Sequence, residues 1–201
     1  MWIYLVRHGE TMGNRQRIVQ VPETPLSLIG EQQAQYLANA YKNAPISMIL
    51  CSDYKRTQHT AKALHKKTGS KLILTECLRE RNFGDLRGRS YDDIDVDFFA
   101  KDYHPPGGES HPQFSSRIKK AWKLVEELAN QQTGDLFVMT HGLVVRCILS
   151  DILSLPADVL ASIDVSNTCV TKINILDKSL IPLLCDSSHL PSEVSVNGGA
   201  V

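Results

Sequence analysis

The sequence predicts an α/β fold, a three-layer αβα sandwich with a mostly parallel central sheet and an antiparallel edge. Two observations carry this prediction: short apolar runs alternate with amphipathic helical patterns, and two strand-like segments near the C-terminal end are joined by a short polar turn. The chain has 201 residues and is 42% hydrophobic, which is enough for one sizeable core. We therefore expect a single domain over residues 1–190 and a flexible tail over residues 191–201.

Four apolar runs, at residues 2–6, 46–51, 72–74 and 136–139, are predicted as strands. Each run is short and continuous rather than alternating, which is typical of parallel strands that are buried on both faces. Two further strands, at residues 169–176 and 180–185, flank a polar turn near Asp177. Together they predict an antiparallel hairpin at one edge of the sheet.

Four helices are predicted from apolar residues at helical spacing. The first follows Ser27, a suitable N-cap, and the second follows Asp53. The third begins soon after Pro112 and carries a continuous apolar stripe. The fourth follows His141, and its apolar residues on all sides predict burial.

Two segments, residues 12–25 and 85–112, fit neither pattern and are predicted to pass over a binding site. The second contains an acidic and aromatic stretch from Tyr91 to Phe99, which favours a short covering helix. Its carboxylates lack the glycine and the regular spacing of a calcium-binding loop, so no metal site is predicted there.

Composition limits the classes of partner. Lysine plus arginine number 22 and aspartate plus glutamate number 22, so the formal net charge is zero and no nucleic-acid partner is expected. No apolar run approaches the roughly 20 residues of a membrane helix, and the five scattered cysteines form no CxxC pair. We expect reduced thiols, a cytoplasmic location and no contact with a membrane.

Polar side chains follow the predicted strands where each strand ends. They are Arg7 and His8 after the first strand, Ser52 and Arg56 after the second, Glu80 after the third, and His141 after the fourth. In an open α/β sheet the ligand binds outside the carboxyl ends of the strands, so these side chains are expected to meet at one edge.

The residue types at this edge favour an anion over a metal. Two guanidinium groups would repel a cation, whereas their planar forks match phosphate oxygens. A neutral imidazole held among them can attack phosphorus and form a phosphoramidate. The sequence therefore predicts phosphoryl chemistry at His8.

The residues 5–11, LVRHGET, resemble the RHGE[TS] signature of the histidine phosphatase superfamily, branch 1, which is phosphoglycerate-mutase-like. The similarity extends over nearly the whole chain, because further segments resemble the family's successive motifs in order. These are Asn14, Pro25 to Ser27, Gly30, Gln33 with Ala34, Ser52 with Arg56, Leu78 with Glu80, Gly84 with Gly88, Pro106 to Glu109, and Thr140 to Gly142.

The resemblance implies a phosphoglycerate-mutase-like fold and a phosphohistidine mechanism without a cofactor. It implies His8 as the nucleophile and Glu80 as the proton donor. It further implies a phosphate pocket formed by Arg7, Asn14, Arg56, His141 and Gly142. Two departures stand outside the catalytic positions: His59 replaces the usual glutamine, and Arg87 replaces a frequent glutamate.

A phosphatase acting on small phosphate monoesters, such as phosphorylated sugars or carboxylic acids, is the function that the resemblance favours. A phosphoglycerate-type mutase, a protein phosphatase of the same fold and a catalytically silent binding module are the alternatives. The family's mutases carry a larger insertion after the glutamate motif, and a silent module would not need both a nucleophile and an acid. A homodimer is compatible with the sequence.

Overall fold

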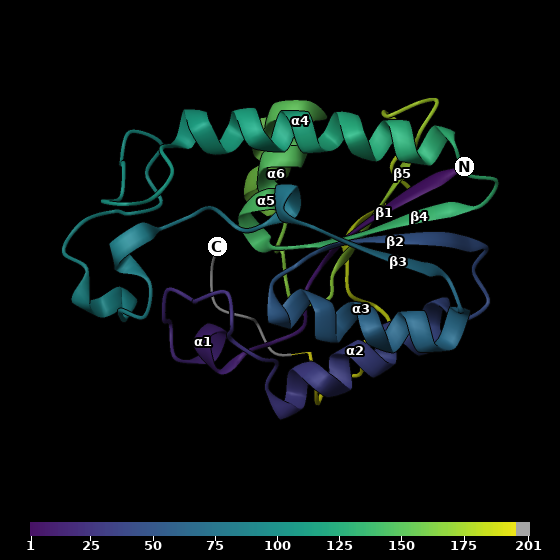
Figure 1. Ribbon diagram of the computed structural model, residues 1–201, viewed down its shortest axis with the longest axis horizontal. Coiled ribbons are helices and arrows are strands. Elements are labelled where there is room, and N and C mark those ends of the chain that lie inside the picture. Colours follow the sequence, from purple (N-terminus) through teal and green to yellow (C-terminus); the bar gives the residue numbers. More distant parts are fainter. Residues whose placement is uncertain (196–201) are drawn as a thin grey trace.

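The computed structural model describes residues 1–195, which contain one six-stranded sheet (Figure 1). Its strands are β1 (Trp2–Arg7), β2 (Ile46–Ser52), β3 (Lys71–Thr75), β4 (Asp135–Thr140), β5 (Val170–Asn174) and β6 (Leu183–Asp186). They lie in the order β3-β2-β4-β1-β5-β6. Strands β1 to β4 run parallel, and β5 pairs antiparallel with both β1 and β6. The predicted mostly parallel sheet with an antiparallel edge is confirmed.

Helices cover both faces of this sheet. One face carries α2 (Leu28–Tyr41) and α3 (Lys55–Thr68), and the other carries α4 (His111–Asn130) and α5 (Gly142–Cys147), with α5 continued by the π-helical turn η4 (Ile148–Ile152) (Figure 1). The short helix α1 (Met12–Arg15) follows β1, and α6 (Ala157–Ser162) follows η4. None of the helices in residues 1–195 is long and apolar enough to cross a bilayer.

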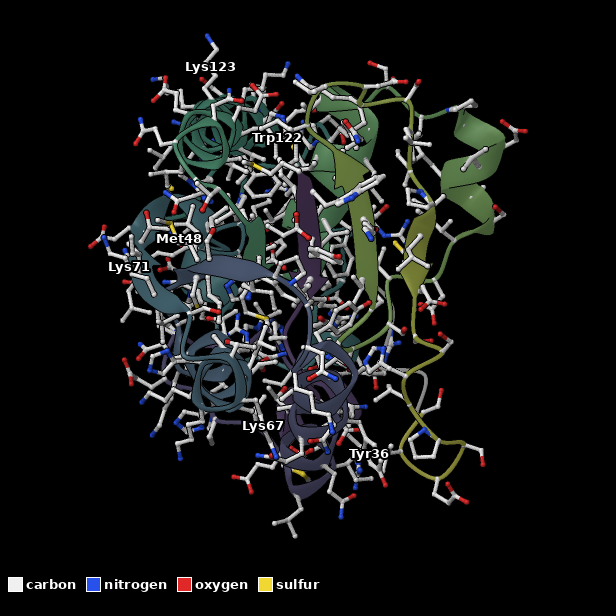
Figure 2. All side chains as sticks on the ribbon, turned by 90° about the vertical axis from the view of Figure 1, so that its right-hand side faces the viewer. Tyr36, Met48, Lys67, Lys71, Trp122 and Lys123 are labelled. Atoms are coloured by element: carbon white, nitrogen blue, oxygen red, sulfur yellow. The ribbon has the colours of Figure 1, made fainter. Side chains whose placement is uncertain are left out.

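Successive residues of each inner strand pack into two different cores, one on each face of the sheet. In β1, Ile3 and Leu5 face the cluster under α4, whereas Tyr4 and Val6 face the cluster under α2 and α3. All four side chains are buried. Figure 2 shows how α4 closes one core, because Trp122 points toward the sheet while Lys123 points away from it. Burial on both faces explains why the strands are continuous apolar runs.

The helix starts agree closely with the sequence. Ser27 caps α2, since its hydroxyl oxygen accepts a hydrogen bond from Gly30 N at 3.0 Å. Helix α4 begins at His111, slightly earlier than predicted, and Ser110 is its N-cap. Pro112 lies inside the first turn, where its missing N–H has no helical partner to lose.

Two local predictions were wrong. The strand at residues 72–74 is not buried on both faces, because β3 lies at the edge of the sheet and Leu74 is 47% exposed. The stretch from Tyr91 to Phe99 forms only a three-residue 3₁₀ turn, η3 (Tyr91–Asp93), instead of a covering helix. Its aspartates and β-branched residues are weak helix formers, and its aromatic side chains pack into a separate small cluster.

The chain beyond β6 returns to the body of the protein. Val194 is buried, and its carbonyl accepts a hydrogen bond from Gln33 Nε2 at 2.9 Å. The flexible tail predicted for residues 191–201 therefore begins with a packed segment as far as it is described. Residues 196–201 lie outside the described part of the chain.

Candidate active site

The segments that follow β1, β3 and β4 meet at one edge of the sheet. The backbone N–H of His8, directly after β1, donates to Thr140 O at 3.0 Å and joins this end to that of β4. The Thr140 hydroxyl in turn donates to Leu78 O at 2.8 Å, which brings the segment after β3 to the same place. Side chains that are far apart in the sequence thereby become neighbours, as the fold rule requires.

His8 is held as a neutral imidazole of defined tautomer. It is 3% exposed, and its Nδ1 lies 2.7 Å from Gly9 O; since a carbonyl can only accept, Nδ1 carries the proton. The other ring nitrogen, Nε2, accepts a hydrogen bond from Arg56 Nε at 3.2 Å. Burial and the cations of Arg56 and Arg7 lower the pKa of His8 well below its ordinary value. The lone pair at Nε2 is therefore available at neutral pH.

The backbone of the loop after β1 is fixed by close packing on α2. A Cβ atom on Gly30 would lie 2.0 Å from Glu10 O, so only glycine permits this approach. The Ser27 hydroxyl donates to Glu10 Oε1 at 2.6 Å, and Asn167 Nδ2 donates to the carbonyl of His8 at 3.0 Å. His8 thus projects from a loop that is held on several sides.

Two guanidinium groups flank His8. Arg7 and Arg56 are each 2% exposed. Arg7 Nη1 donates to Val165 O at 2.5 Å, and Arg56 Nη1 donates to Val21 O at 3.1 Å. Burial lowers the pKa of Arg56 to about 10, so the group is still charged at neutral pH. Buried positive charge of this kind is the setting for an anion.

Glu80 brings a carboxyl group to this cation pair. It follows η1 (Glu76–Leu78), and its Oε1 and Oε2 accept hydrogen bonds from Arg81 N at 3.0 Å and Leu143 N at 3.1 Å. Burial raises the pKa of Glu80, although the two backbone N–H groups and the nearby arginines oppose the shift. A carboxyl group with a raised pKa is suited to donate a proton.

His141 lies at the N-cap of α5, beside His8. The two rings meet edge to face with centroids 5.2 Å apart. The His141 Nε2 atom lies 2.8 Å from the Ser52 hydroxyl, whereas its buried Nδ1 has no hydrogen-bond partner among the residues described. Burial and the neighbouring Arg56 lower the pKa of His141 well below its ordinary value.

One narrow cavity, of about 40 Å³, is surrounded by most of the predicted site residues. Those that line it are Arg7, His8, Asn14, Arg56 and Glu80. His141 and Gly142 do not line it: the ring of His141 contacts that of His8, and Gly142 is the first residue of α5. The Asn14 Oδ1 atom accepts from the Thr11 backbone N–H at 3.1 Å in the cap of α1, which fixes the orientation of its amide.

A larger cleft of about 500 Å³ adjoins this cavity. Tyr54, Glu80 and Arg87 line both spaces, and Arg87 Nη2 donates to the Tyr54 hydroxyl at 2.9 Å. Arg87, a departure from the family pattern, therefore stands where the cavity meets the cleft. His59, the other departure, lies in a separate groove between α2 and α3.

Sequence reasoning missed the aromatic wall of the cavity. Phe83, Tyr91, Phe98 and Phe99 line it, and Phe83 and Phe98 are buried in a cluster of their own. The signal for this wall is the repetition of aromatic residues among the aspartates at residues 91–99, a stretch whose pattern favoured a short helix in the sequence. Sequence reasoning also missed Arg81, which lines the cavity and is 3% exposed.

The donor set of residues 1–195 includes no group of three or more His, Cys, Asp and Glu side chains arranged to hold a metal ion. The residues that line the cavity include histidine, arginine and glutamate side chains. Together they offer a neutral nucleophile, two cations and an acid around one cavity.

The family model of the histidine phosphatase superfamily (branch 1) matches residues 3–183. The protein named Probable phosphoglycerate mutase GpmB of Escherichia fergusonii is 33% identical over 204 residues, with 94% of each chain covered.

Two solved structures have the same fold. A candidate alpha-ribazole-5'-P phosphatase of Escherichia coli K-12 superposes with a TM-score of 0.80 at 26% identity, with 94% of this chain and 98% of the other covered. A mycobacterial glucosyl-3-phosphoglycerate phosphatase superposes with a TM-score of 0.75 at 23% identity, with 86% and 90% covered, which bears on the fold alone. With the family model spanning nearly the whole chain, this protein belongs to the histidine phosphatase superfamily, branch 1.

Proposed function

We propose that this chain hydrolyses small phosphate monoesters through a phosphohistidine on Nε2 of His8, with Glu80 as the proton donor. The observation that carries the proposal is the pair of opposed environments: a buried neutral His8 beside two guanidiniums, and a carboxyl group of raised pKa at the same cavity. A nucleophile and an acid separated in this way suit a displacement at phosphorus.

In the first step the Nε2 lone pair of His8 attacks phosphorus, and the bond from phosphorus to the ester oxygen breaks. Glu80 gives its proton to that oxygen, and the alcohol leaves. The Arg56 N–H that rests on Nε2 must turn to a phosphoryl oxygen, where it stabilises the developing charge together with Arg7. His141 does not line the cavity of the free protein, but its ring meets that of His8 and its Nδ1 has no hydrogen-bond partner among the residues described, which supports a contact with the phosphoryl group once substrate is bound.

In the second step the ionised Glu80 takes a proton from water, and the water oxygen attacks the phosphorus of phosphohistidine. The P–N bond breaks and its electron pair returns to Nε2. Inorganic phosphate leaves, while the proton gained from water restores Glu80 as an acid.

The position of Glu80 supports a location for the leaving group. An acid must lie next to the oxygen that it protonates, and Glu80 lines both the narrow cavity and the larger cleft. We expect the phosphoryl group in the cavity and the alcohol in the cleft, whose charged and amide side chains suit a hydroxylated or carboxylated group. The aromatic wall over the cavity favours small esters over a phosphoprotein.

The direct test is to trap the phosphohistidine intermediate, which is labile in acid and is therefore quenched in alkali. Wild-type protein is quenched in alkali after reaction with p-nitrophenyl phosphate, and phosphohistidine is located by mass spectrometry. His8→Ala should lose the label and at least about 10⁴-fold in kcat. His59→Ala, on α3 but outside both cavities, is the matched control and should retain both. Full activity in His8→Ala contradicts the proposal.

A mutase is the second candidate, because the Escherichia fergusonii relative carries that name. Incubation with 3-phosphoglycerate and 2,3-bisphosphoglycerate separates the two. We expect phosphate release to exceed formation of 2-phosphoglycerate, and the opposite ratio would establish mutase activity.

A further inference from the structure

The segment that carries Glu80 has no regular secondary structure. It runs between η1 and η2 (Gly84–Leu86), so no strand ladder or helix fixes its backbone. Acid catalysis is sensitive to such freedom, since a misplacement of about 1 Å can lower a rate by about 10²-fold. Something outside the segment must hold it in place.

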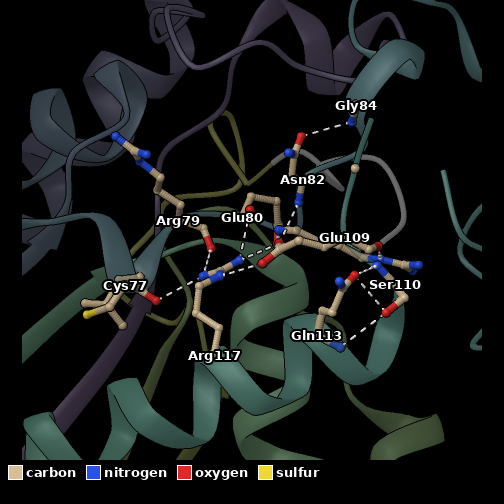
Figure 3. Close-up of polar contacts among 12 residues, drawn as sticks. Cys77, Arg79, Glu80, Asn82, Gly84, Glu109, Ser110, Gln113 and Arg117 are labelled. Atoms are coloured by element: carbon tan, nitrogen blue, oxygen red, sulfur yellow. Dashed lines mark hydrogen bonds and ion pairs between the residues drawn. The ribbon is translucent and has the colours of Figure 1, made fainter. Parts of the chain in front are cut away.

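Arg117 of α4 meets the backbone of this segment with one planar group (Figure 3). Its Nη1 donates to Cys77 O at 3.0 Å and to Arg79 O at 2.9 Å. Its Nη2 lies 3.4 Å from the carbonyl oxygen of Glu80 itself. The fork of the guanidinium makes this possible, because a single lysine ammonium could not reach all three carbonyls in one plane.

Glu109 completes the arrangement from the opposite side. Its carboxylate accepts from Arg117 Nε and Nη2, each at 2.8 Å, and also from Asn82 N at 2.9 Å. Hydrogen bonds from Arg117 and Asn82 keep the pKa of Glu109 below its ordinary value, although burial opposes them. The backbone of Glu109 makes two further hydrogen bonds. Its carbonyl accepts from the Arg81 side-chain Nε at 3.1 Å, and its N–H donates to Asn82 O at 2.7 Å.

The contacts of this ion pair fall on both sides of Glu80. Arg117 donates to the carbonyls of Arg79 and Glu80. On the other side, the Glu109 carboxylate accepts from the backbone N–H of Asn82. Neither side chain lines the narrow cavity around His8, so neither reaches the phosphoryl group there. Both line the larger cleft, where a direct contact with the alcohol would affect every ester alike, whereas positioning of Glu80 affects the esters that need an acid. The side chains of Arg117 and Glu109 are 24% and 21% exposed, which is buried enough for their geometry to be defined.

We propose that the Arg117–Glu109 ion pair is a positioning device for the acid Glu80. It fixes the backbone of residues 77–82 so that the two N–H groups of Arg81 and Leu143 aim the carboxyl at the leaving oxygen. The inference rests on the proposed phosphatase function and deepens it, because it assigns the accuracy of proton donation to two residues that do not line the narrow cavity.

The leaving group provides a test that general loss of structure would not mimic. Phenyl phosphate releases a basic phenolate that needs a proton, whereas 2,4-dinitrophenyl phosphate releases a phenolate that is stable without one. The two esters share a ring, so binding in the cleft is comparable. The kcat/KM of each reports the phosphorylation step, in which Glu80 acts as the acid.

Arg117→Met should lower kcat/KM for phenyl phosphate by roughly 10–100-fold and that for 2,4-dinitrophenyl phosphate by less than about threefold. Glu109→Gln should shift the ratio in the same direction by a smaller factor. Arg117→Lys should recover part of the loss, because the charge returns but the fork does not. Lys120→Met, an exposed site about one turn further along α4, is the matched control and should leave both values unchanged.

An equal fall on both esters in soluble, folded variants would overturn the inference, since it would show a loss of binding or of general stability. If Arg117→Met does not fold, Glu109→Gln and Arg117→Lys decide the question with the same ratio. A wild-type protein that hydrolyses neither ester and forms no phosphohistidine would instead overturn the proposed function, and the assignment to Glu80 with it.

Discussion

At the scale of the residue, burial moves the pKa values of His8 and Glu80 in opposite directions. The pKa of His8 falls well below its ordinary value, and that of Glu80 rises. In the proposed mechanism His8 reacts only without its proton and Glu80 only with one. We therefore expect kcat/KM to rise as His8 deprotonates at acidic pH and to fall as Glu80 ionises at higher pH, which gives a bell-shaped profile.

Glu80→Gln tests whether the alkaline limb of the pH profile of kcat/KM belongs to the Glu80 carboxyl. The amide cannot ionise, so the alkaline limb should disappear and kcat/KM at the optimum should fall by about 10²–10⁴-fold. The profile is measured with phenyl phosphate, after correction for the ionisation of the ester itself. An alkaline limb that persists unchanged in Glu80→Gln would assign it to another group.

At the scale of the element, the segment from residues 84 to 108 behaves as a separate wall of the cavity. Phe98 packs edge to face with Phe83 and Tyr91, at centroid distances of 5.6 and 5.0 Å, in a cluster distinct from the two sheet cores. Phe98→Ala should therefore loosen this wall without unfolding the sheet. We expect faster hydrogen exchange of residues 84–108, unchanged protection of β1 and β4, and a higher KM.

Phe114→Ala is the contrasting variant. Phe114 is buried in the main core under α4, so its truncation should lower the free energy of unfolding by about 3–5 kcal/mol and affect the whole domain. Equal loss of protection in β4 for both variants would contradict the separation of the aromatic cluster from the core.

The elements differ in how far the sequence predicted them. Strands β1, β2 and β4 bury both faces, so their apolar runs were clear, and the strand-end rule brought His8, Arg56 and Glu80 together. Strand β3 was misjudged because the sequence does not reveal which strand lies at the edge. The aromatic wall and the Arg117–Glu109 pair depend on loop conformations, which local propensity does not determine.

At the scale of the whole molecule, the fold holds the positive charge of Arg56 at a buried site. Arg56 lies in the first turn of α3, and its hydrogen bonds to His8 and Val21 are to neutral atoms. Burial and the neighbouring cations Arg7 and Arg87 lower its pKa, although Glu80 opposes them. Such a charge opposes folding in the free protein and favours it when an oxyanion is bound.

Thermal unfolding separates these two contributions. Inorganic phosphate or orthovanadate at about 100 times its Kd should stabilise the wild type by about 2.7 kcal/mol, equivalent to an increase in Tm of roughly 5–11 °C for a domain of this size. Arg56→Met should lose most of that increase while the Tm of the free protein stays the same or rises, because a buried cation is replaced by an apolar chain. Lys62 is exposed on α3, the helix that carries Arg56, so Lys62→Met is the matched control. It should keep the wild-type Tm of the free protein and the wild-type increase in Tm with the anion. The opposite result would be a free Arg56→Met protein with a Tm several degrees lower than wild type and an undiminished increase in Tm with the anion. It would show that Arg56 stabilises the fold and that other groups bind the anion.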